Sequence, residues 1–278
     1  MTLHEALVQG TKLLEDAGIA VPRLTAEVLL CHAVHGERPF LYAHPEQELR
    51  EVEWIHYGRY LHERLNGKPT QYITGRQEFY GREFRVTPDV LIPRQETELV
   101  VETALQVGHG ARRILDVGAG SGAIAVTLQL ETQAMVYGTD ISAAALAVAG
   151  ANARKLGARV EFLCCDLMSA IASRSMDVIV SNPPYVPEAE RASLQREVRD
   201  HEPEMALFAG PTGFEIYERL VAEAERVLCP GSWMVLELGY KSRDRVLGMF
   251  GPRWRDVRVV PDLAGIPRVL AARMEGER

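Results

Sequence analysis

From Arg112 onward, short apolar runs alternate with longer runs of helical periodicity, and this alternation constrains the fold more than any other feature of the sequence. Strands that alternate with helices form a parallel, doubly wound sheet, whose ligands lie beyond the carboxyl ends of the strands. Five such strands are expected, followed by two that are close enough in sequence to pair antiparallel. They fall in RRILDV, AMVYGTD, RVEFLCCDL, MDVIVS, SWMVLELG, RWRDVRVVPD and RVLAARME. The sequence therefore predicts an α/β fold with a seven-stranded, mostly parallel sheet.

The chain before this region has a helical period instead. Thr2 and Glu5 have the spacing of a capping box ahead of a first amphipathic helix, and two more helices follow. The inward-facing residues of the third helix are predicted to be Val52, Ile55, Leu61 and Leu65. We predict a helical bundle over residues 1–75, a β-hairpin connector over 76–90, and the sheet domain over 91–278.

Six of the eight histidines lie in the predicted bundle, and Cys31, His32 and His35 are close together in the sequence. Neighbouring residues on a helix point in different directions, so this spacing favours histidines on helix surfaces over a metal site. The bundle has more acidic than basic residues, which argues against a module that reads DNA.

Composition narrows the class of protein further. The chain has 278 residues, of which 47% are hydrophobic and 25% charged, as in an ordinary globular protein. A net charge of -7 argues against a protein that binds nucleic acid through contacts with its phosphates. The four cysteines lack a C-x-x-C spacing, which indicates reduced, buried thiols in a cytoplasmic protein. The N-terminal MTLHEALVQG has no long apolar run, so we expect neither a signal peptide nor a membrane span. We also expect a monomer.

The turn after the first strand, GAGSGA, has the glycine pattern of a nucleotide site. Its residues Gly118, Ala119, Gly120, Ser121 and Gly122 let the backbone approach a ligand closely and present amides to it. Such a turn fits either a nicotinamide nucleotide or S-adenosylmethionine.

Three acidic residues near strand ends bear on that choice. Asp140 ends the second strand, where a carboxylate can accept both hydroxyls of a ribose. Asp116 precedes the glycines and is unfavourable beside a pyrophosphate, but it suits a ligand that carries an ammonium and a sulfonium. Asp166 and Leu167, after the third strand, can supply an acceptor and a backbone amide to adenine. This arrangement favours S-adenosylmethionine.

The fourth strand ends in SNPPYVP, which on local grounds is a strand-ending turn. It also has what methylation of a planar amide or amine requires. The lone pair of such a nitrogen is delocalised, so a site must accept both N–H hydrogens and direct the lone pair at the methyl donor. Asn182 offers a side-chain oxygen, Pro183 a carbonyl held rigid by Pro184, and Tyr185 a ring that can stack on the substrate. No tuned general base is needed, because the nitrogen becomes strongly acidic once it is methylated.

These motifs, together with GKPTQYITGRQEFYG, VLIPRQETE, HEPEMALFAGPTGFEIY, LELG and DLAGIPRV, resemble the PrmC/HemK family over nearly the whole chain. Members of that family use S-adenosylmethionine to methylate the side-chain amide (N5) of the glutamine in the Gly-Gly-Gln motif of peptide chain release factors. The resemblance implies a class I, Rossmann-like methyltransferase fold behind an N-terminal helical domain that binds the substrate protein. It implies no partner in the membrane and no direct contact with nucleic acid.

The resemblance also implies roles for individual residues. Gly118 to Gly122, Asp140, Leu167 and Asn182 should contact the cofactor, and Asn182 to Tyr185 should hold the glutamine. Arg94, Glu96 and Glu98 should form the rim of the site, with Arg94 paired to a carboxylate. The sequence departs from the family pattern at Gln95, where proline is frequent, and at Leu167, where an aromatic residue sometimes covers adenine.

Three alternatives remain open at this stage. An adenine-N6 methyltransferase acting on DNA or another nucleic acid shares the Asn-Pro-Pro-Tyr motif, although no basic groove or target-recognition domain is legible in the sequence. A non-catalytic binding protein could have retained the cofactor fold. A dehydrogenase would use the glycine turn for a nicotinamide nucleotide.

Overall fold

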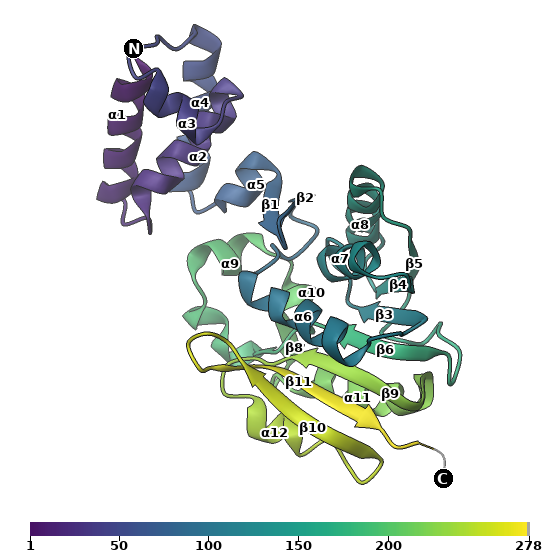
Figure 1. The fold of residues 1–278 in the computed structure, drawn as a ribbon. Helices are drawn as coiled ribbons and strands as arrows, with labels where there is room; N and C mark the ends of the chain where they lie inside the picture. The colour runs from purple at the N-terminus through teal and green to yellow at the C-terminus, as the bar shows by residue number, and fades with distance from the viewer. Residues whose placement is uncertain (277–278) are drawn as a thin grey trace. The chain divides into compact units, whose positions relative to one another are not determined.

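The structure, a computed structural model, describes residues 1–276, and the chain divides into two compact units. The first unit consists of Met1–Arg76 together with Gln195–His201. The second consists of Gln77–Leu194 and the described chain from Glu202 onward. Figure 1 labels the elements of both units.

The first unit is helical. Its helices are α1 (Leu3–Asp16), α2 (Pro22–Val34), α3 (Arg38–Ala43), α4 (Glu51–Leu65), α5 (Thr70–Thr74) and α9 (Arg196–His201). The predicted capping box begins α1: the Thr2 side-chain oxygen accepts from Glu5 N at 3.2 Å, and Glu5 Oε2 accepts from Thr2 N at 2.8 Å. Apolar side chains of α1, α2 and α4 form the core of this unit.

The buried face of α4 differs from the predicted one. Val52 and Ile55 are 49% and 58% exposed, whereas Tyr57 and Arg64 are buried. Arg64 can be buried because Glu197 of α9 forms an ion pair with it at 2.7 Å. The prediction is confirmed for Leu61, which is buried, and for Leu65, which packs against the core; it was wrong for Val52 and Ile55 because it considered aliphatic residues only. The buried face of α4 instead contains the ring of Tyr57 and the charged side chain of Arg64, which Glu197 neutralises.

The predicted hairpin is present as β1 (Arg76–Phe79) and β2 (Arg82–Arg85). The strands of the main sheet are β3 (Arg113–Val117), β4 (Met135–Asp140), β5 (Val160–Cys164), β6 (Met176–Ser181), β9 (Leu228–Glu237), β10 (Trp254–Pro261) and β11 (Pro267–Met274). A separate short pair joins β7 (Val186–Pro187) and β8 (Phe208–Gly210). The helical elements of the second unit are η1 (Gln95–Thr97), α6 (Glu98–Val107), α7 (Ala123–Glu131), α8 (Ala143–Leu156), η2 (Glu188–Ser193), α10 (Glu204–Leu207), α11 (Glu215–Val227) and α12 (Arg243–Leu247).

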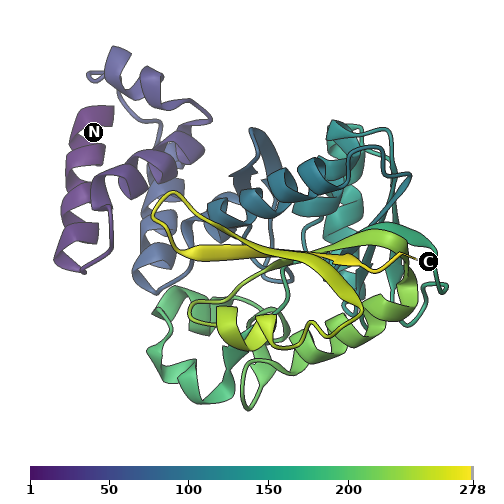
Figure 2. The same cartoon turned by 60° about the horizontal axis from the view of Figure 1, so that its bottom comes forward.

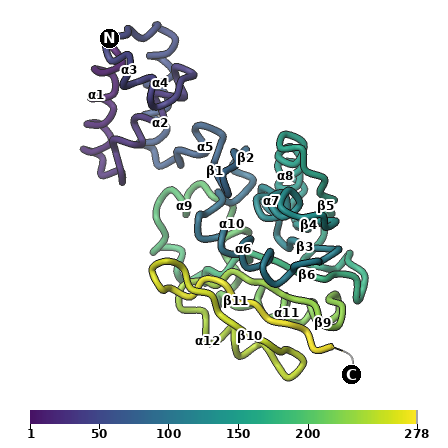
Figure 3. Tube along the Cα trace, viewed as in Figure 1, coloured from purple at the N-terminus to yellow at the C-terminus, as the bar shows by residue number. Residues whose placement is uncertain are grey.

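The sheet has the order β10-β11-β9-β6-β3-β4-β5. Neighbours from β9 through β5 pair in parallel, and β11 is antiparallel to both β9 and β10. The prediction of a seven-stranded, mostly parallel sheet is confirmed. From β3 the chain proceeds through β4 to β5 on one side and then returns to β6 on the other (Figure 3). This reversal of strand order makes the crevice at the carboxyl ends of β3 and β6 the expected ligand site.

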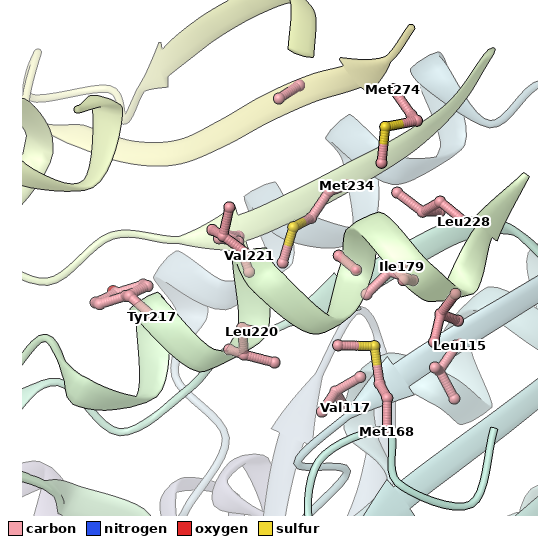
Figure 4. Packing of buried hydrophobic residues seen from close by; sticks show 14 of the residues in the cluster. Leu115, Val117, Met168, Ile179, Tyr217, Leu220, Val221, Leu228, Met234 and Met274 are labelled. Atoms are coloured by element: carbon pink, nitrogen blue, oxygen red, sulfur yellow. The ribbon is translucent and has the colours of Figure 1, made fainter. Parts of the chain in front are cut away.

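The two faces of the sheet carry different helices, with α6 on one side and α11 on the other (Figure 2). Successive side chains of a strand point to opposite faces of the sheet. Leu115 and Val117 of β3 therefore pack in the apolar cluster that includes Leu220 of α11, called here the α11 core (Figure 4). Ile114 points the other way and packs with α6 and α7. The same alternation directs Asp116 of β3 and Glu237 of β9 to the α6 and α7 side.

The four cysteines are free thiols, but only Cys31 is buried, and Cys164 is exposed. The expectation of four buried thiols was wrong, because Cys164 ends β5, an edge strand of the sheet. None of the helices among residues 1–276 combines the length and apolar character that a membrane crossing requires.

Candidate active site

A cavity of about 630 Å³ opens at the carboxyl ends of the strands, and its lining belongs entirely to the second unit. Ten of the predicted site residues line it: Arg94, Gly118, Ala119, Gly120, Ser121, Asp140, Asp166, Leu167, Asn182 and Pro184. Six others are not lining residues: Glu96, Glu98, Asp116, Gly122, Pro183 and Tyr185. The predicted cofactor residues and the Asn-Pro-Pro-Tyr segment therefore meet at one cavity.

The glycine turn connects β3 to α7. Gly118, Gly120 and Gly122 have φ angles of 77°, 53° and 80°, a region that side-chain-bearing residues rarely adopt. A Cβ on Gly118 or Gly120 would meet no atom of the described part of the chain within 4 Å, whereas one on Gly122 would lie 3.1 Å from Ala149 Cβ. The first two glycines thus leave open space beside the cavity, and Gly122 allows α7 and α8 to approach each other.

Asp140, at the end of β4, is held by backbone amides on both carboxylate oxygens. Oδ2 accepts from Gly120 N and Oδ1 from Ser142 N, each at 2.9 Å. A carboxylate oxygen can accept more than one hydrogen bond, so both oxygens remain competent to accept from a diol. Ile141 follows Asp140, lines the cavity and is 58% exposed. The sequence analysis did not identify this apolar residue.

Asp116 is fully buried beside the glycine turn. Its Oδ2 accepts from Ala125 N at 3.0 Å, whereas Oδ1 has no hydrogen-bond partner among the described residues. Burial raises the pKa of Asp116 from 3.8 to about 7, with the Ala125 hydrogen bond opposing this rise and the charge of Asp140 adding to it. A buried carboxylate with an unpaired oxygen is relieved by a nearby positive charge, so it fits a cationic ligand such as S-adenosylmethionine better than a pyrophosphate.

Asp166 and Leu167 follow β5. The Asp166 carboxylate accepts from Arg219 Nη2 at 2.7 Å, and both side chains are about half exposed. Leu167 has a φ of 45°, which a residue with a side chain adopts only rarely and at some cost in free energy. The backbone of this turn is thus fixed in an unusual conformation at the cavity wall.

In the Asn-Pro-Pro-Tyr segment, Asn182 Nδ2 donates to Thr97 Oγ1 at 3.1 Å. The carboxamide oxygen of Asn182 is therefore the atom left to accept from a ligand. Pro183 is buried. Tyr185 packs against the α11 core, and burial raises its pKa to about 12.

Of the three residues expected to form the rim, Arg94 lines the cavity, whereas Glu96 and Glu98 do not. Arg94 pairs with the buried Glu202 at 2.5 Å, so the expected carboxylate partner of Arg94 is present. Glu96 is exposed and does not line the cavity. Glu98 Oε1 accepts from Tyr80 N at 2.8 Å, so its carboxylate holds the hairpin instead of forming the rim.

The sequence analysis missed two further buried residues at this site, Thr97 and Glu237. The Thr97 hydroxyl donates to Glu237 Oε2 at 2.6 Å and accepts from Asn182. Burial raises the pKa of Glu237 to about 7, and the Thr97 hydrogen bond opposes this rise. A signal was available in SWMVLELG, where a single acid ends an apolar strand at the ligand edge of the sheet.

Within residues 1–276, no group of three or more His, Cys, Asp or Glu side chains could hold a metal ion.

Comparisons with known proteins agree with this architecture. Residues 5–75 match the family described as PrmC N-terminal domain, and residues 95–200 match the methyltransferase small domain. The release factor glutamine methyltransferase of Koribacter versatilis (strain Ellin345) is 47% identical over 277 residues, which cover 98% of this chain and 99% of that protein. The enzyme of that name from Nitratidesulfovibrio vulgaris is 42% identical, covering 98% of this chain and 95% of that protein. In fold, the chain is similar to the T. thermophilus 16S rRNA N2 G1207 methyltransferase solved with AdoMet and guanosine: the TM-score is 0.51 at 21% identity, with 72% of this chain and 50% of that one covered.

The sheet and its strand-end cavity define a class I methyltransferase that depends on S-adenosylmethionine. More narrowly, the chain belongs to the release factor glutamine methyltransferase family. The predicted family, fold, enzyme class and cofactor are confirmed, and the dehydrogenase interpretation is no longer supported.

Proposed function

We propose that this enzyme transfers a methyl group from S-adenosylmethionine to the side-chain amide nitrogen (N5) of the glutamine in the Gly-Gly-Gln motif of peptide chain release factors. Full-length similarity to enzymes named for this activity supports the substrate class. The observation that carries the chemistry is the Asn182 carboxamide, which lines the cavity with its nitrogen engaged by Thr97 and its oxygen available.

The reaction needs a rigid pair of acceptors more than it needs a base. When bound, S-adenosylmethionine would supply an electrophilic methyl group on a sulfonium; the sulfur would leave as the neutral thioether of S-adenosylhomocysteine, and the methylated nitrogen would release a proton to water. Asn182 Oδ1 is assigned one N–H hydrogen of the glutamine amide, and the carbonyl of Pro183, which is buried between the lining residues Asn182 and Pro184, is assigned the other. The two acceptors fix the plane of the group and turn its lone pair toward the donor. Tyr185 was predicted to stack on the substrate, but it does not line the cavity and packs on the α11 core, so we assign it the support of this segment.

The cofactor is assigned to the other side of the cavity. The backbone from Gly118 to Gly122 passes along it, and Asp140 accepts the ribose hydroxyls. Asp116 supplies negative charge for the cationic part of the ligand. Asp166, the Leu167 amide and the exposed Ile141 side chain contact adenine. The two held oxygens of Asp140 and the unpaired oxygen of Asp116 support this assignment.

The helical unit is assigned to binding of the release factor. In this scheme residues 1–75 bind the substrate protein, 76–90 connect, and 91–278 carry the chemistry. The match of residues 5–75 to the PrmC N-terminal domain supports this, as do apolar side chains left exposed on the unit, Val21, Leu24, Val52 and Ile55. The enzyme acts in the cytoplasm, where release factors work, without a nucleic-acid or membrane partner. The proposal includes a monomeric enzyme.

A mass measurement tests the function. Purified release factor is incubated with the enzyme and S-adenosylmethionine, and the peptide that contains Gly-Gly-Gln is expected to gain the mass of one methyl group. A release factor with this glutamine replaced by alanine is the matched control and should gain none. No gain on the wild-type factor, or methylation of a DNA oligonucleotide in its place, would reject the proposed substrate.

A further inference from the structure

Three polar side chains form a chain of hydrogen bonds behind the proposed acceptor pair. Asn182 Nδ2 donates to Thr97 Oγ1 at 3.1 Å, and Thr97 Oγ1 donates to Glu237 Oε2 at 2.6 Å. Thr97 and Glu237 are 4% and 3% exposed, so the hydrogen bond between them is shielded from water, whereas Asn182 is half-buried and lines the cavity. The parallel register of β6 and β9, which pairs Ser181 with Leu236, brings the residues that follow them side by side.

Which group donates and which accepts along these hydrogen bonds follows from the number of hydrogens that each group can offer. An ionised carboxylate only accepts, so Glu237 requires the single hydroxyl hydrogen of Thr97. The Thr97 oxygen can then only accept from its other neighbour. Asn182 must therefore present its NH₂ group to Thr97, which leaves its oxygen for the cavity. Without this constraint the two ends of a carboxamide are nearly equal in shape, and either could face the substrate.

We propose that Thr97 and Glu237 are positioning residues that fix the carboxamide of Asn182 with its oxygen toward the substrate amide. The proposal rests on the function proposed above, since the orientation matters only for a substrate that donates N–H hydrogens. A reversed Asn182 would oppose its own NH₂ group to the NH₂ group of the substrate, which removes one acceptor and leaves donors facing each other.

The backbone around Glu237 is fixed from the opposite face of the sheet. The Tyr217 hydroxyl donates to the Glu237 carbonyl at 2.7 Å and accepts from Gly239 N at 3.1 Å. Gly239 also lies directly against Tyr185, because a Cβ on Gly239 would be 2.7 Å from Tyr185 Cδ2. The end of β9 and the Asn-Pro-Pro-Tyr segment are thus held at a fixed separation.

The protonation state of Glu237 makes the orientation depend on pH. A protonated Glu237 can donate to Thr97, and the Thr97 hydroxyl is then free to donate to Asn182 Oδ1, which allows the carboxamide to reverse. Burial raises the pKa of Glu237 to about 7, Thr97 and the charges of Arg268 and Arg94 oppose this, and Glu96 adds to it. Tyr185 of the neighbouring segment and Tyr217 of α11, on the other face of the sheet, also interact electrostatically with Glu237, and burial raises the pKa of both.

The test compares Thr97→Val, Thr97→Ser and Glu237→Gln with the wild type on release factor. Val has the shape of Thr without the hydroxyl, and Gln has the shape of Glu but can also donate. Both variants are expected to lower kcat roughly tenfold to a hundredfold, the range for a misplaced reactive group, with the Kd for S-adenosylmethionine within about twofold of wild type. Thr97→Ser should recover most of the lost turnover.

Thr127→Val is the matched control. Thr127 is another fully buried threonine of the same unit, its hydroxyl has no hydrogen-bond partner among the described residues, and it does not line the cavity. Its substitution should leave kcat unchanged. The thermal midpoint Tm of every variant separates lost turnover from lost folding.

The pH profile supplies a readout that a purely structural role would not change. The wild-type kcat should fall below pH about 7 as Glu237 takes up a proton, and Glu237→Gln should lose this dependence. Wild-type turnover in Thr97→Val, or equal losses in Thr97→Val and Thr97→Ser, would overturn the proposal.

A second measurement holds even if release factor is not the substrate. The side-chain NH₂ of Asn182, observed by ¹⁵N NMR, should exchange slowly with water in the wild type and faster in Thr97→Val. Equal exchange rates would reject the hydrogen-bond chain, whereas failure to methylate the wild-type release factor would reject only the proposed function.

Discussion

Two strands of the same sheet, β3 and β9, carry a buried carboxylate near their carboxyl ends, and the surroundings of the two differ. Asp116 of β3 keeps an oxygen without a hydrogen-bond partner in residues 1–276, while Glu237 of β9 is bonded to Thr97 and through it to Asn182. Burial raises both pKa values to about 7. An unpaired buried acid suits a ligand that brings positive charge, whereas a paired one suits the orientation of a neighbouring group. The cofactor side and the substrate side of the cavity thus use similar acids for different purposes.

The largest effect is expected on the substrate side. Asn182→Ala removes an acceptor that acts on the reacting amide, so kcat should fall by about 10²–10³-fold, the range for loss of one catalytic hydrogen-bonding group. The dissociation constant for S-adenosylmethionine, measured by calorimetry, should change far less. Equal losses in turnover and in cofactor affinity would contradict the assignment of Asn182 to the substrate side of the cavity.

On the cofactor side, Asp116→Asn should weaken binding of S-adenosylmethionine by about 1.5–3 kcal/mol, as for loss of a hydrogen bond to a charged group. The cofactor-free variant should be at least as stable as wild type at pH 8, because an uncompensated buried charge has been removed. Calorimetry and thermal unfolding measure the two effects. Unchanged affinity together with a lower Tm would make Asp116 a structural residue only.

The pH dependence of stability and of cofactor binding tests the same contrast between the two buried acids. The pKa of Asp116 lies at about 7 in the folded chain against an ordinary 3.8, so between these values the folded state holds a proton that the unfolded state has lost. The contribution of Asp116 to stability therefore declines as pH rises through this window. A cationic ligand favours the ionised form, so affinity for S-adenosylmethionine should increase as pH rises through about 7, and Asp116→Asn should abolish that increase. The same slope in wild type and variant would assign the titration to another group.

The smallest effect concerns the packing of the substrate side. Gly239→Ala places a methyl group 2.7 Å from the Tyr185 ring, so the Asn-Pro-Pro-Tyr segment must shift. Overpacking of this kind costs about 1–3 kcal/mol of stability, and kcat should fall severalfold with cofactor affinity retained. Gly251→Ala, where a Cβ would meet no atom of residues 1–276 within 4 Å, is the control. If both variants behave alike, close packing at Gly239 has no part in catalysis.

Local pattern was enough for much of this protein and misleading in some places. Strand alternation, the glycine turn and acids at strand ends are local features, and the main sheet and cavity follow them. The buried face of α4 was misread, because Arg64 is buried through a partner in α9. Glu98 was expected at the rim, yet its carboxylate holds the backbone of the hairpin at Tyr80. In both cases a charged side chain was placed by a partner that its own segment does not reveal.

The sequence by itself determined the sheet, the turn and the side of the sheet on which ligands bind, because a strand's period of two and the direction of parallel strands are properties of short segments. Only the tertiary structure decided which polar groups meet there. Thr97 and Glu237 are 140 residues apart and Thr97 and Asn182 are 85 apart, so their contacts depend on strand order and on the placement of α6. The orientation of the Asn182 carboxamide follows from those contacts, since a hydroxyl with one hydrogen, held by an ionised acid, can only accept from its other neighbour.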